Sequence, residues 1–300
     1  MKPALELQEK GQAFLFIANY HALTTVDDPK ALRENTLDVA LDFLACGLDP
    51  AKAVFFRQSD VPEVTELTWL LSVVTPMGLL ERCHSYKDKL AKGVAPTHGL
   101  FSYPVLMAAD ILAYQSNVVP VGQDQKQHVE VTRDIAIKFN NKFGPVFTIP
   151  EPSIKESVAV VPGLDGRKMS KPYDNHLELF GAEKELKART MRIVTDSTPL
   201  ESPKDPEKCT VFALYRLLAP QAEAEAMAAR YRAGGYGYGQ AKQALYDVMR
   251  AYFEPFRKKR DELRKDPGHV EAILRKGADV ARAEARKTLD KARAAIGISG

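Results

Sequence analysis

The segment YPVLMAADILAYQSNVVPVGQDQKQHVEVTRDIA, from Tyr103 to Ala136, decides the fold of this chain. Its pattern predicts a helix, a short apolar strand at Val118–Val121, a glycine turn and a second helix. The second helix begins with polar groups at the carboxyl end of the strand. Open α/β sheets bind nucleotides there, because the strand end and the helix amino terminus leave unpaired N–H donors and a positive dipole. The segment therefore predicts a nucleotide-binding α/β fold.

One face of the first helix collects three different side chains. Tyr103, Met107 and Asp110 lie at offsets of zero, four and seven residues, so they share one wall. Small and aliphatic neighbours surround Asp110, which disfavours a merely solvated carboxylate. This wall predicts a pocket for something flat and apolar that carries one hydrogen-bond donor.

Composition limits the class of protein. A chain of 300 residues can bury a full core and form two domains. No apolar run approaches the length that crosses a bilayer, and the amino terminus shows no signal sequence. Cys46, Cys83 and Cys209 lack the paired spacing of disulfide or zinc frameworks. We expect a cytoplasmic protein without membrane association or a bound structural metal.

Charge is distributed unevenly along the chain. The formal net charge is +3, yet the region from Gln240 onward carries fifteen Lys or Arg against nine Asp or Glu. A basic helical tail on a near-neutral body suits a polyanionic partner such as RNA, although a solvated helix surface explains the same asymmetry.

Strands and helices alternate in the first half of the chain. Short apolar runs predict buried strands, and the segments between them have helical spacing, which together indicate a parallel sheet. The expected strands are 13–18, 53–57, 118–121 and 157–161, and the expected helices include 24–46 and 64–74.

The second half of the chain has a different pattern. From Glu183 to Ile296 the apolar spacing is helical, with a Pro-rich connector at 198–206 and a Gly-rich one at 234–239. The GGYGYG sequence in the second connector follows a helix and not a strand, so we expect a helix–helix turn and not a phosphate loop. The pattern predicts an α/β domain over 1–175 and a helical domain over 176–300.

Two motifs combine in one family resemblance. GLDGRKMSK at 163–171 resembles the KMSKS signature of class I aminoacyl-tRNA synthetases, and MAAD at 107–110 with VGQDQKQH at 121–128 resembles the tryptophanyl group of that class. The resemblance extends from AFLFIANYHALT at 13–24 to the helical carboxyl-terminal part. It implies a Rossmann-like catalytic domain followed by a helical domain that binds the tRNA anticodon, with the last helix a candidate to return to the catalytic domain.

The resemblance also implies an activity. A tryptophan–tRNA ligase activates L-tryptophan with ATP, whose phosphates carry Mg²⁺, and then passes the acyl group of tryptophanyl-adenylate to tRNA(Trp). The family works as a homodimer, and we expect a homodimer here. The alternatives are a tyrosyl-type synthetase and a catalytically impaired, RNA-binding relative.

For ATP, the resemblance implies a lysine loop and a strand-end turn. Lys168 and Lys171 would meet the charge that develops on departing pyrophosphate. Gly122 would permit close approach of the ribose, and Asp124 would accept a hydrogen bond from a ribose hydroxyl. Lys89 matches a lysine that reaches the phosphates, although a surface charge explains it equally well. The other implied ATP-binding residues are Gln123, Val160, Met169, Ser170 and Pro172.

For tryptophan, the resemblance gives Asp110 the role of accepting the indole N–H. A site with such a buried acceptor rejects phenylalanine by roughly 10⁴-fold or more, because the carboxylate would stay unpaired. Tyr103 and Gln125 would recognise the α-amino and carboxylate groups. His21 either lines the pocket floor or is a structural histidine. The residues implied to pack the ring are Met107, Val119 and Val121.

The basic helices after Gln240 would face tRNA, including FRKKRDELRK at 256–265. Recognition there would rest on phosphate contacts and on stacking with splayed bases.

The chain departs from the family pattern in two places. Family members carry a strand and an HIGH-like motif before the segment that corresponds to Lys2, so we expect the sequence to be incomplete at its amino terminus. Pro172 stands where KMSKS has its last Ser, and we expect a stiffer loop with retained chemistry.

Overall fold

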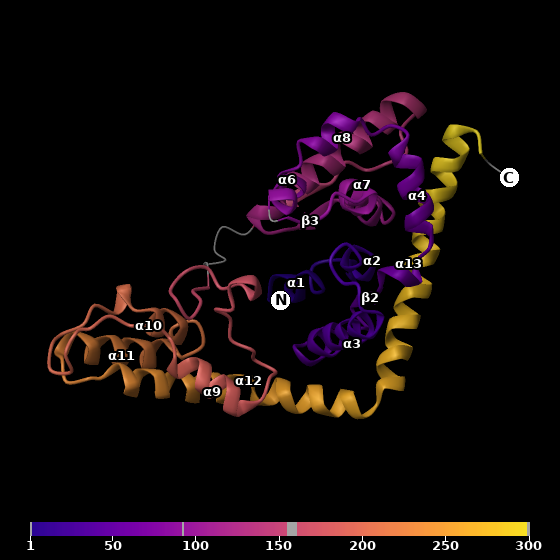
Figure 1. Ribbon diagram of the computed structural model, residues 1–300. Helices are drawn as coiled ribbons and strands as arrows, with labels where there is room; N and C mark the ends of the chain where they lie inside the picture. The colour runs from indigo at the N-terminus through magenta and orange to yellow at the C-terminus, as the bar shows by residue number, and fades with distance from the viewer. Residues whose placement is uncertain (1, 92, 155–160, 299–300) are drawn as a thin grey trace. The chain divides into compact units, whose positions relative to one another are not determined.

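The computed structural model describes residues 2–91, 93–154 and 161–298 (Figure 1). The chain divides into two compact units, residues 1–155 with 262–300, called unit 1, and residues 156–261, called unit 2. The division differs from the predicted boundary at residue 175, because Leu164 packs in the hydrophobic core of unit 2.

Unit 1 contains two short parallel sheets. β1 (Ala13–Ile17) pairs with β2 (Ala53–Arg57), with Ala13 opposite Ala53. β3 (Val118–Pro120) pairs with β4 (Glu151–Ser153). These pairings confirm the α/β class and three of the predicted strands.

The fourth predicted strand has a different outcome. Residues 157–160 of the predicted range 157–161 lie outside the described residues, and Val161 is not part of a strand. β4 was not predicted. Pro152 at its centre lacks the N–H that strand pairing uses, and proline in a short segment usually indicates a loop.

Helices surround both sheets of unit 1. Their ends are set by local chemistry: the Asp28 carboxylate accepts hydrogen bonds from the N–H groups of Lys30 and Ala31, so α3 begins at Pro29 and not at Thr24. Thr97 caps α7 in the same way through the N–H of Leu100. The helices are α1 (Lys2–Leu7), α2 (Asn19–Ala22), α3 (Pro29–Ala45), α4 (Glu63–Ser72), α5 (Met77–Glu81), α6 (His84–Ala91), α7 (His98–Leu112), α8 (Lys126–Phe143) and α13 (Pro267–Ile296), with short 3₁₀ turns η1 (Gln58–Asp60) and η2 (Gln123–Gln125).

The long helix α13 belongs to unit 1, where it runs along β2 and α4 (Figure 1). A Cβ atom at Gly277 would lie 1.9 Å from the carbonyl oxygen of Phe55, so only glycine lets the helix backbone reach the strand. Arg57 at the end of β2 forms two hydrogen bonds with the Glu271 carboxylate, at 2.9 and 2.7 Å. The buried Glu63 carboxylate contacts Arg282.

Unit 2 is helical around one hydrophobic core that includes Leu186, Phe212, Tyr231 and Leu245. Its elements are η3 (Lys171–Tyr173), α9 (Glu183–Met191), η4 (Pro206–Lys208), α10 (Thr210–Tyr215), α11 (Gln221–Ala233) and the residues up to 261 of α12 (Tyr238–Lys265).

The Gly-rich connector is a helix–helix turn between α11 and α12, as predicted. Gly234 has φ +80, and a Cβ atom there would lie 2.3 Å from the carbonyl oxygen of Glu201. The glycine therefore serves a close backbone approach within unit 2. None of the helices in the described part of the chain is both long and apolar enough to cross a bilayer.

Candidate active site

Asp110 is a buried carboxylate in the interior of α7, with 3% of its surface exposed. Its Oδ2 atom accepts a hydrogen bond from the Gln58 amide at 2.7 Å and lies 2.9 Å from Nε2 of His21. Burial raises the pKa of Asp110, while His21 and Gln58 act in the opposite direction. The site therefore holds a carboxylate in apolar surroundings with polar partners on one oxygen.

Gln58 connects three elements around this carboxylate. It is the first residue after β2, and its side-chain oxygen accepts from the N–H groups of Tyr20 at 3.0 Å and His21 at 3.4 Å. The same amide donates to Asp110, so it fixes α2 relative to α7. Sequence reasoning missed Gln58, although its place at the carboxyl end of a parallel strand is a usable signal.

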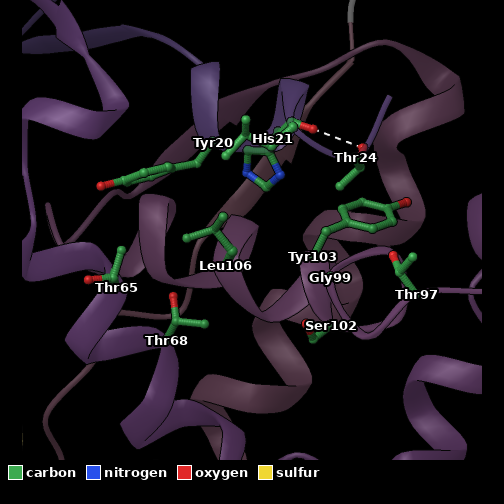
Figure 2. Close-up of a pocket in the computed structure, with 11 residues that line it drawn as sticks. Tyr20, His21, Thr24, Thr65, Thr68, Thr97, Gly99, Ser102, Tyr103 and Leu106 are labelled. Atoms are coloured by element: carbon green, nitrogen blue, oxygen red, sulfur yellow. Dashed lines mark hydrogen bonds between the residues drawn. The ribbon is translucent and has the colours of Figure 1, made fainter. Parts of the chain in front are cut away.

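A cavity of about 370 Å³ opens beside this network, between α2, α4 and α7 (Figure 2). Figure 2 shows the His21 imidazole and the Tyr103 ring along its wall, with Leu106 to one side of them and Thr65 and Thr68 on α4. His21 and Tyr103 meet edge to face, with ring centroids 6.1 Å apart. The lining is largely apolar with several hydroxyl groups, which suits an aromatic ligand that carries polar groups.

Tyr103 lies at the centre of a second cluster. Its hydroxyl is 2.8 Å from Nε2 of His128, a residue that sequence reasoning did not single out although it lies in the quoted VGQDQKQH segment. The Lys89 ammonium lies 4.9 Å from the Tyr103 ring centroid and donates to the Thr24 hydroxyl at 3.4 Å. Burial lowers the pKa of Lys89. The structure thus brings Lys89, predicted for ATP, next to Tyr103, predicted for tryptophan.

The turn after β3 carries the remaining predicted residues of unit 1. Val119 and Val121 are half-buried, Gly122 and Gln123 are exposed, and the half-buried Gln125 donates its N–H to the Gly122 carbonyl at 2.9 Å. Asp124 lies in η2, but its side chain is outside the described part of the structure. Met107 is half-buried on α7, one turn before Asp110. Of the predicted tryptophan residues, only His21 and Tyr103 line the cavity.

The predicted lysine loop lies in unit 2. Pro162 and Lys168 form an antiparallel bridge, and the Met169 N–H donates to the Val161 carbonyl at 2.9 Å, so residues 161–169 form a small hairpin. Lys168 and Lys171 have exposed side chains and form no ion pair among the described residues.

Three further predicted ATP residues belong to this loop region. Met169 and Ser170 are half-buried, and Ser170 precedes η3 as its N-cap residue. Val160 lies outside the described residues, and the side chain of Pro172 is likewise not described. The predicted ATP residues are therefore divided between the two units.

Comparisons with known proteins agree with the family resemblance of the sequence motifs. Residues 1–254 match the family model of class I tRNA synthetases for W and Y. The tryptophan–tRNA ligase of Rhodopirellula baltica is 56% identical over 294 residues, covering 98% of this chain and 92% of that protein. The ligase of Campylobacter jejuni is 52% identical over 298 residues, covering 99% and 93%.

Solved structures agree with the sequence comparisons. The crystal structure of the Campylobacter jejuni tryptophanyl-tRNA synthetase with ADP and tryptophan aligns with a TM-score of 0.95 at 52% identity, over 99% of this chain and 93% of that one. The Mycoplasma pneumoniae synthetase aligns with a TM-score of 0.82 at 30% identity, over 99% and 91%.

Proposed function

This chain belongs to the class I tRNA synthetases for tryptophan and tyrosine and has the function of a tryptophan–tRNA ligase, and we propose that the Asp110 carboxylate selects its substrate. The tryptophan relatives disfavour the tyrosyl alternative. In the first half-reaction the tryptophan carboxylate attacks the α-phosphorus of ATP and pyrophosphate leaves. In the second, a ribose hydroxyl at the tRNA(Trp) 3′ end attacks the acyl carbon and AMP leaves.

The buried position of Asp110 is the observation that carries the proposal. Each additional hydrogen-bond donor stabilises a carboxylate in apolar surroundings, and the indole N–H is such a donor. Phenylalanine has no ring donor, so it would leave acceptor capacity unsatisfied while displacing water. Tyrosine has a donor, but it is a hydroxyl at the end of a single ring and would lie at a different place from the indole N–H. The largely apolar cavity beside His21 and Tyr103 supports an aromatic amino acid as the ligand.

The direct test of this function is ATP–pyrophosphate exchange with each aromatic amino acid, followed by charging of tRNA(Trp). We expect exchange with tryptophan that exceeds exchange with phenylalanine by roughly 10⁴-fold or more in kcat/KM. We also expect exchange with tryptophan to exceed exchange with tyrosine. Equal rates with tyrosine would contradict the proposal.

The lysines supply positive charge. We assign Lys168 and Lys171 to the pyrophosphate that leaves, and Lys89 to the phosphates of bound ATP. An ammonium that meets charge formed only in the transition state raises kcat, whereas one that meets charge already present in ATP lowers KM. Gly122, Gln123 and Asp124 are proposed for the ribose side of the nucleotide, as are Met169, Ser170, Pro172 and Val160 for the loop side.

Magnesium is proposed as part of the substrate. Among the described residues, no group of three His, Cys, Asp or Glu side chains converges in the manner of a metal site. We take the nucleotide as the Mg²⁺ complex of ATP, because phosphate oxygens are ligands that Mg²⁺ prefers. The reaction needs no protein nucleophile because the tryptophan carboxylate attacks.

The helical unit is proposed to bind the tRNA anticodon through basic side chains of α12. Lys259 is exposed, whereas Lys258 pairs with Glu254 at 2.7 Å. Replacing Lys259 by Ala should weaken tRNA binding and reduce the slope of log K against log salt by about one unit, if it contacts one phosphate. The exposed Lys276 of α13 is the control, and an unchanged slope in both variants would contradict the assignment.

A homodimer is proposed through exposed apolar residues of α4, of α5 and of the turn between them, called the exposed apolar row. Trp69 lies in α4, Val73 just after α4 and Met77 at the start of α5; all three are exposed, and Trp69, the only tryptophan of the chain, is 70% exposed. A row of large apolar side chains on a water-facing surface indicates an interface. A cytoplasmic location remains a prediction.

A further inference from the structure

Asn175 is a buried amide beneath the lysine loop, with 2% of its surface exposed. Its Oδ1 atom accepts the N–H of Ser170 at 2.7 Å. Its Nδ2 group donates to the Asp165 carboxylate at 2.8 Å and to the Lys168 carbonyl at 3.1 Å. One side chain thus bonds the backbone at Lys168 and at the residue before Lys171.

The two lysines have little else to fix them. Their side chains are exposed and form no ion pair within the described ranges, so the backbone that carries each lysine determines the region its ammonium can reach. That backbone is held by the hairpin bond from Gly163 N–H to the Arg167 carbonyl at 2.6 Å and by Asn175. Asn175 is therefore a polar link between the loop and unit 2, beside the apolar packing of Leu164 in the core.

Hydrogen bonds from α9 hold the backbone on both sides of Asn175. Arg189 of α9 donates to the carbonyls of Asp174 at 2.7 Å and His176 at 2.9 Å, the two neighbours of Asn175. The Asn175 carbonyl accepts the N–H of Leu164 at 2.8 Å. A chain of bonds thus runs from a helix through Asn175 to the loop.

Gly163 packs directly against Asn175, and no larger side chain fits at that position. A Cβ atom at Gly163 would lie 2.7 Å from the Asn175 carbonyl oxygen and 2.3 Å from its Nδ2. The hydrogen bond from Asn175, and then those from Arg167, lower the pKa of the Asp165 carboxyl, so this acceptor is charged at neutral pH. A charged acceptor strengthens the bond from the amide.

We propose that Asn175 is the positioning residue of the lysine loop: it sets the backbone positions of Lys168 and Lys171, and its loss lowers the rate of adenylate formation without weakening tryptophan binding. The inference rests on the proposed roles of the two lysines. Misplacement of a charge by about 1 Å can cost on the order of 100-fold in rate, so a buried amide that touches no substrate can still control kcat.

The experiment measures ATP–pyrophosphate exchange in the full chain, with kcat and the KM for tryptophan separated. Asn175→Ala should lower kcat about 10- to 100-fold and leave the KM for tryptophan within about twofold. The matched control is Asn140→Ala. Asn140 in α8 likewise organises a turn, donating to the Phe147 carbonyl at 2.8 Å and accepting from the Val146 N–H at 3.0 Å. It should lose thermal stability and keep kcat.

A second pair of variants keeps the test valid if Asn175→Ala does not fold. Asn175→Asp retains an acceptor for Ser170 but sets a carboxylate against Asp165, so kcat should fall. Adding Asp165→Asn to Asn175→Asp lets the new amide donate in the opposite direction and should restore part of kcat. If Asn175→Asp lowers kcat and the double variant restores none of it, the hydrogen bond between residues 165 and 175 does not position the loop.

Lys168→Ala and Lys171→Ala, measured in parallel, separate the two claims. If they lose kcat while the variants of Asn175 keep it, the positioning role is wrong and the lysine role stands. If the lysine variants keep full kcat, the proposed lysine role fails and the inference fails with it.

Discussion

At the scale of single residues, the site depends on polar groups that are buried together. Asp110 accepts from Gln58 and contacts His21, while Tyr103 contacts His128 and lies beneath the Lys89 ammonium. Each of these pairs joins segments that are distant in the sequence. The loss of one partner therefore removes a hydrogen bond from a group that is buried or half-buried.

Replacing Gln58 with Met should raise the KM for tryptophan and leave the KM for ATP unchanged. Methionine keeps the volume but removes the donor to Asp110 and the acceptor for the Tyr20 N–H. Hydrogen bonds to charged groups contribute roughly 1.5–3 kcal/mol, which corresponds to about a 10- to 100-fold change. Gln115→Met, which removes an amide that bonds to the Val146 carbonyl, is the control. Equal effects of both on KM would count against a role for Gln58 at the site.

The lowered pKa of Lys89 predicts a pH dependence of ATP binding. Burial favours the neutral amine, so the charge is lost at a pH below the ordinary lysine value of 10.5. The KM for ATP should rise as the pH is raised from about 7 to about 10, because the attraction to phosphate disappears. Lys89→Arg should flatten this rise, since a guanidinium stays protonated. The same alkaline rise in the Arg variant would assign the titration to another group.

The residue identities of the site were only partly predictable. Asp110, Tyr103 and Met107 share a face by helical spacing, and that pattern is local. Gln58 and Asn175 were not predicted, because each acts through partners that only the tertiary fold brings near. The close approach of Gly163 to Asn175 is likewise invisible in a sequence.

At the scale of elements, α13 packs against both a strand and a helix of unit 1, β2 and α4. It crosses β2 at Gly277, is paired with Arg57 through Glu271 and contacts Glu63 through Arg282. Helical periodicity predicted the helix itself. The partner of its apolar face could not be predicted, because periodicity shows which face is buried and not what covers it.

Gly277→Ala should destabilise the protein, against the usual direction for helices. Glycine inside a helix normally costs about 1 kcal/mol relative to alanine. Here the added Cβ would overlap the Phe55 carbonyl, and overpacking of this kind costs roughly 1–3 kcal/mol. Gly268→Ala in the same helix is the control, since its Cβ would meet Asp266 at 3.4 Å. Urea unfolding measures both, and a gain in stability for Gly277→Ala would contradict the close crossing.

Strand prediction worked for three apolar runs whose burial differs: β2 is largely buried, β1 is mostly half-buried, and β3 is exposed or half-buried. The apolar runs of β1 and β2 are typical of strands covered on both faces. β4 is short and contains Pro152, so its pairing with β3 depends on a neighbour and not on its own composition.

At the scale of the whole molecule, the two compact units carry different parts of the proposed site. The predicted tryptophan residues lie in unit 1 and the lysine loop lies in unit 2. The composition change near residue 175 is real, but core packing decides which unit a segment joins, and Leu164 and Leu177 both pack into the core of unit 2.

The exposed apolar row on α4 and α5 predicts the state of assembly. Replacing Trp69 with Lys should convert a dimer into a monomer, because a charge would be buried at the contact. Sedimentation at several concentrations measures this, and Val280→Lys on α13, at another exposed apolar position, should leave the dimer intact. A wild-type protein that is monomeric at tens of micromolar would rule out the proposed contact.

The most direct measurement is the ratio of kcat/KM for tryptophan to that for tyrosine and phenylalanine, in wild type and in Asp110→Asn. The amide keeps the size of the side chain but loses the charge and replaces one acceptor oxygen with a donor, which would face the indole N–H or the Gln58 amide. We predict that preference for tryptophan falls by at least about 100-fold, mostly through its KM. An unchanged preference in the Asn variant would show that another group selects the substrate.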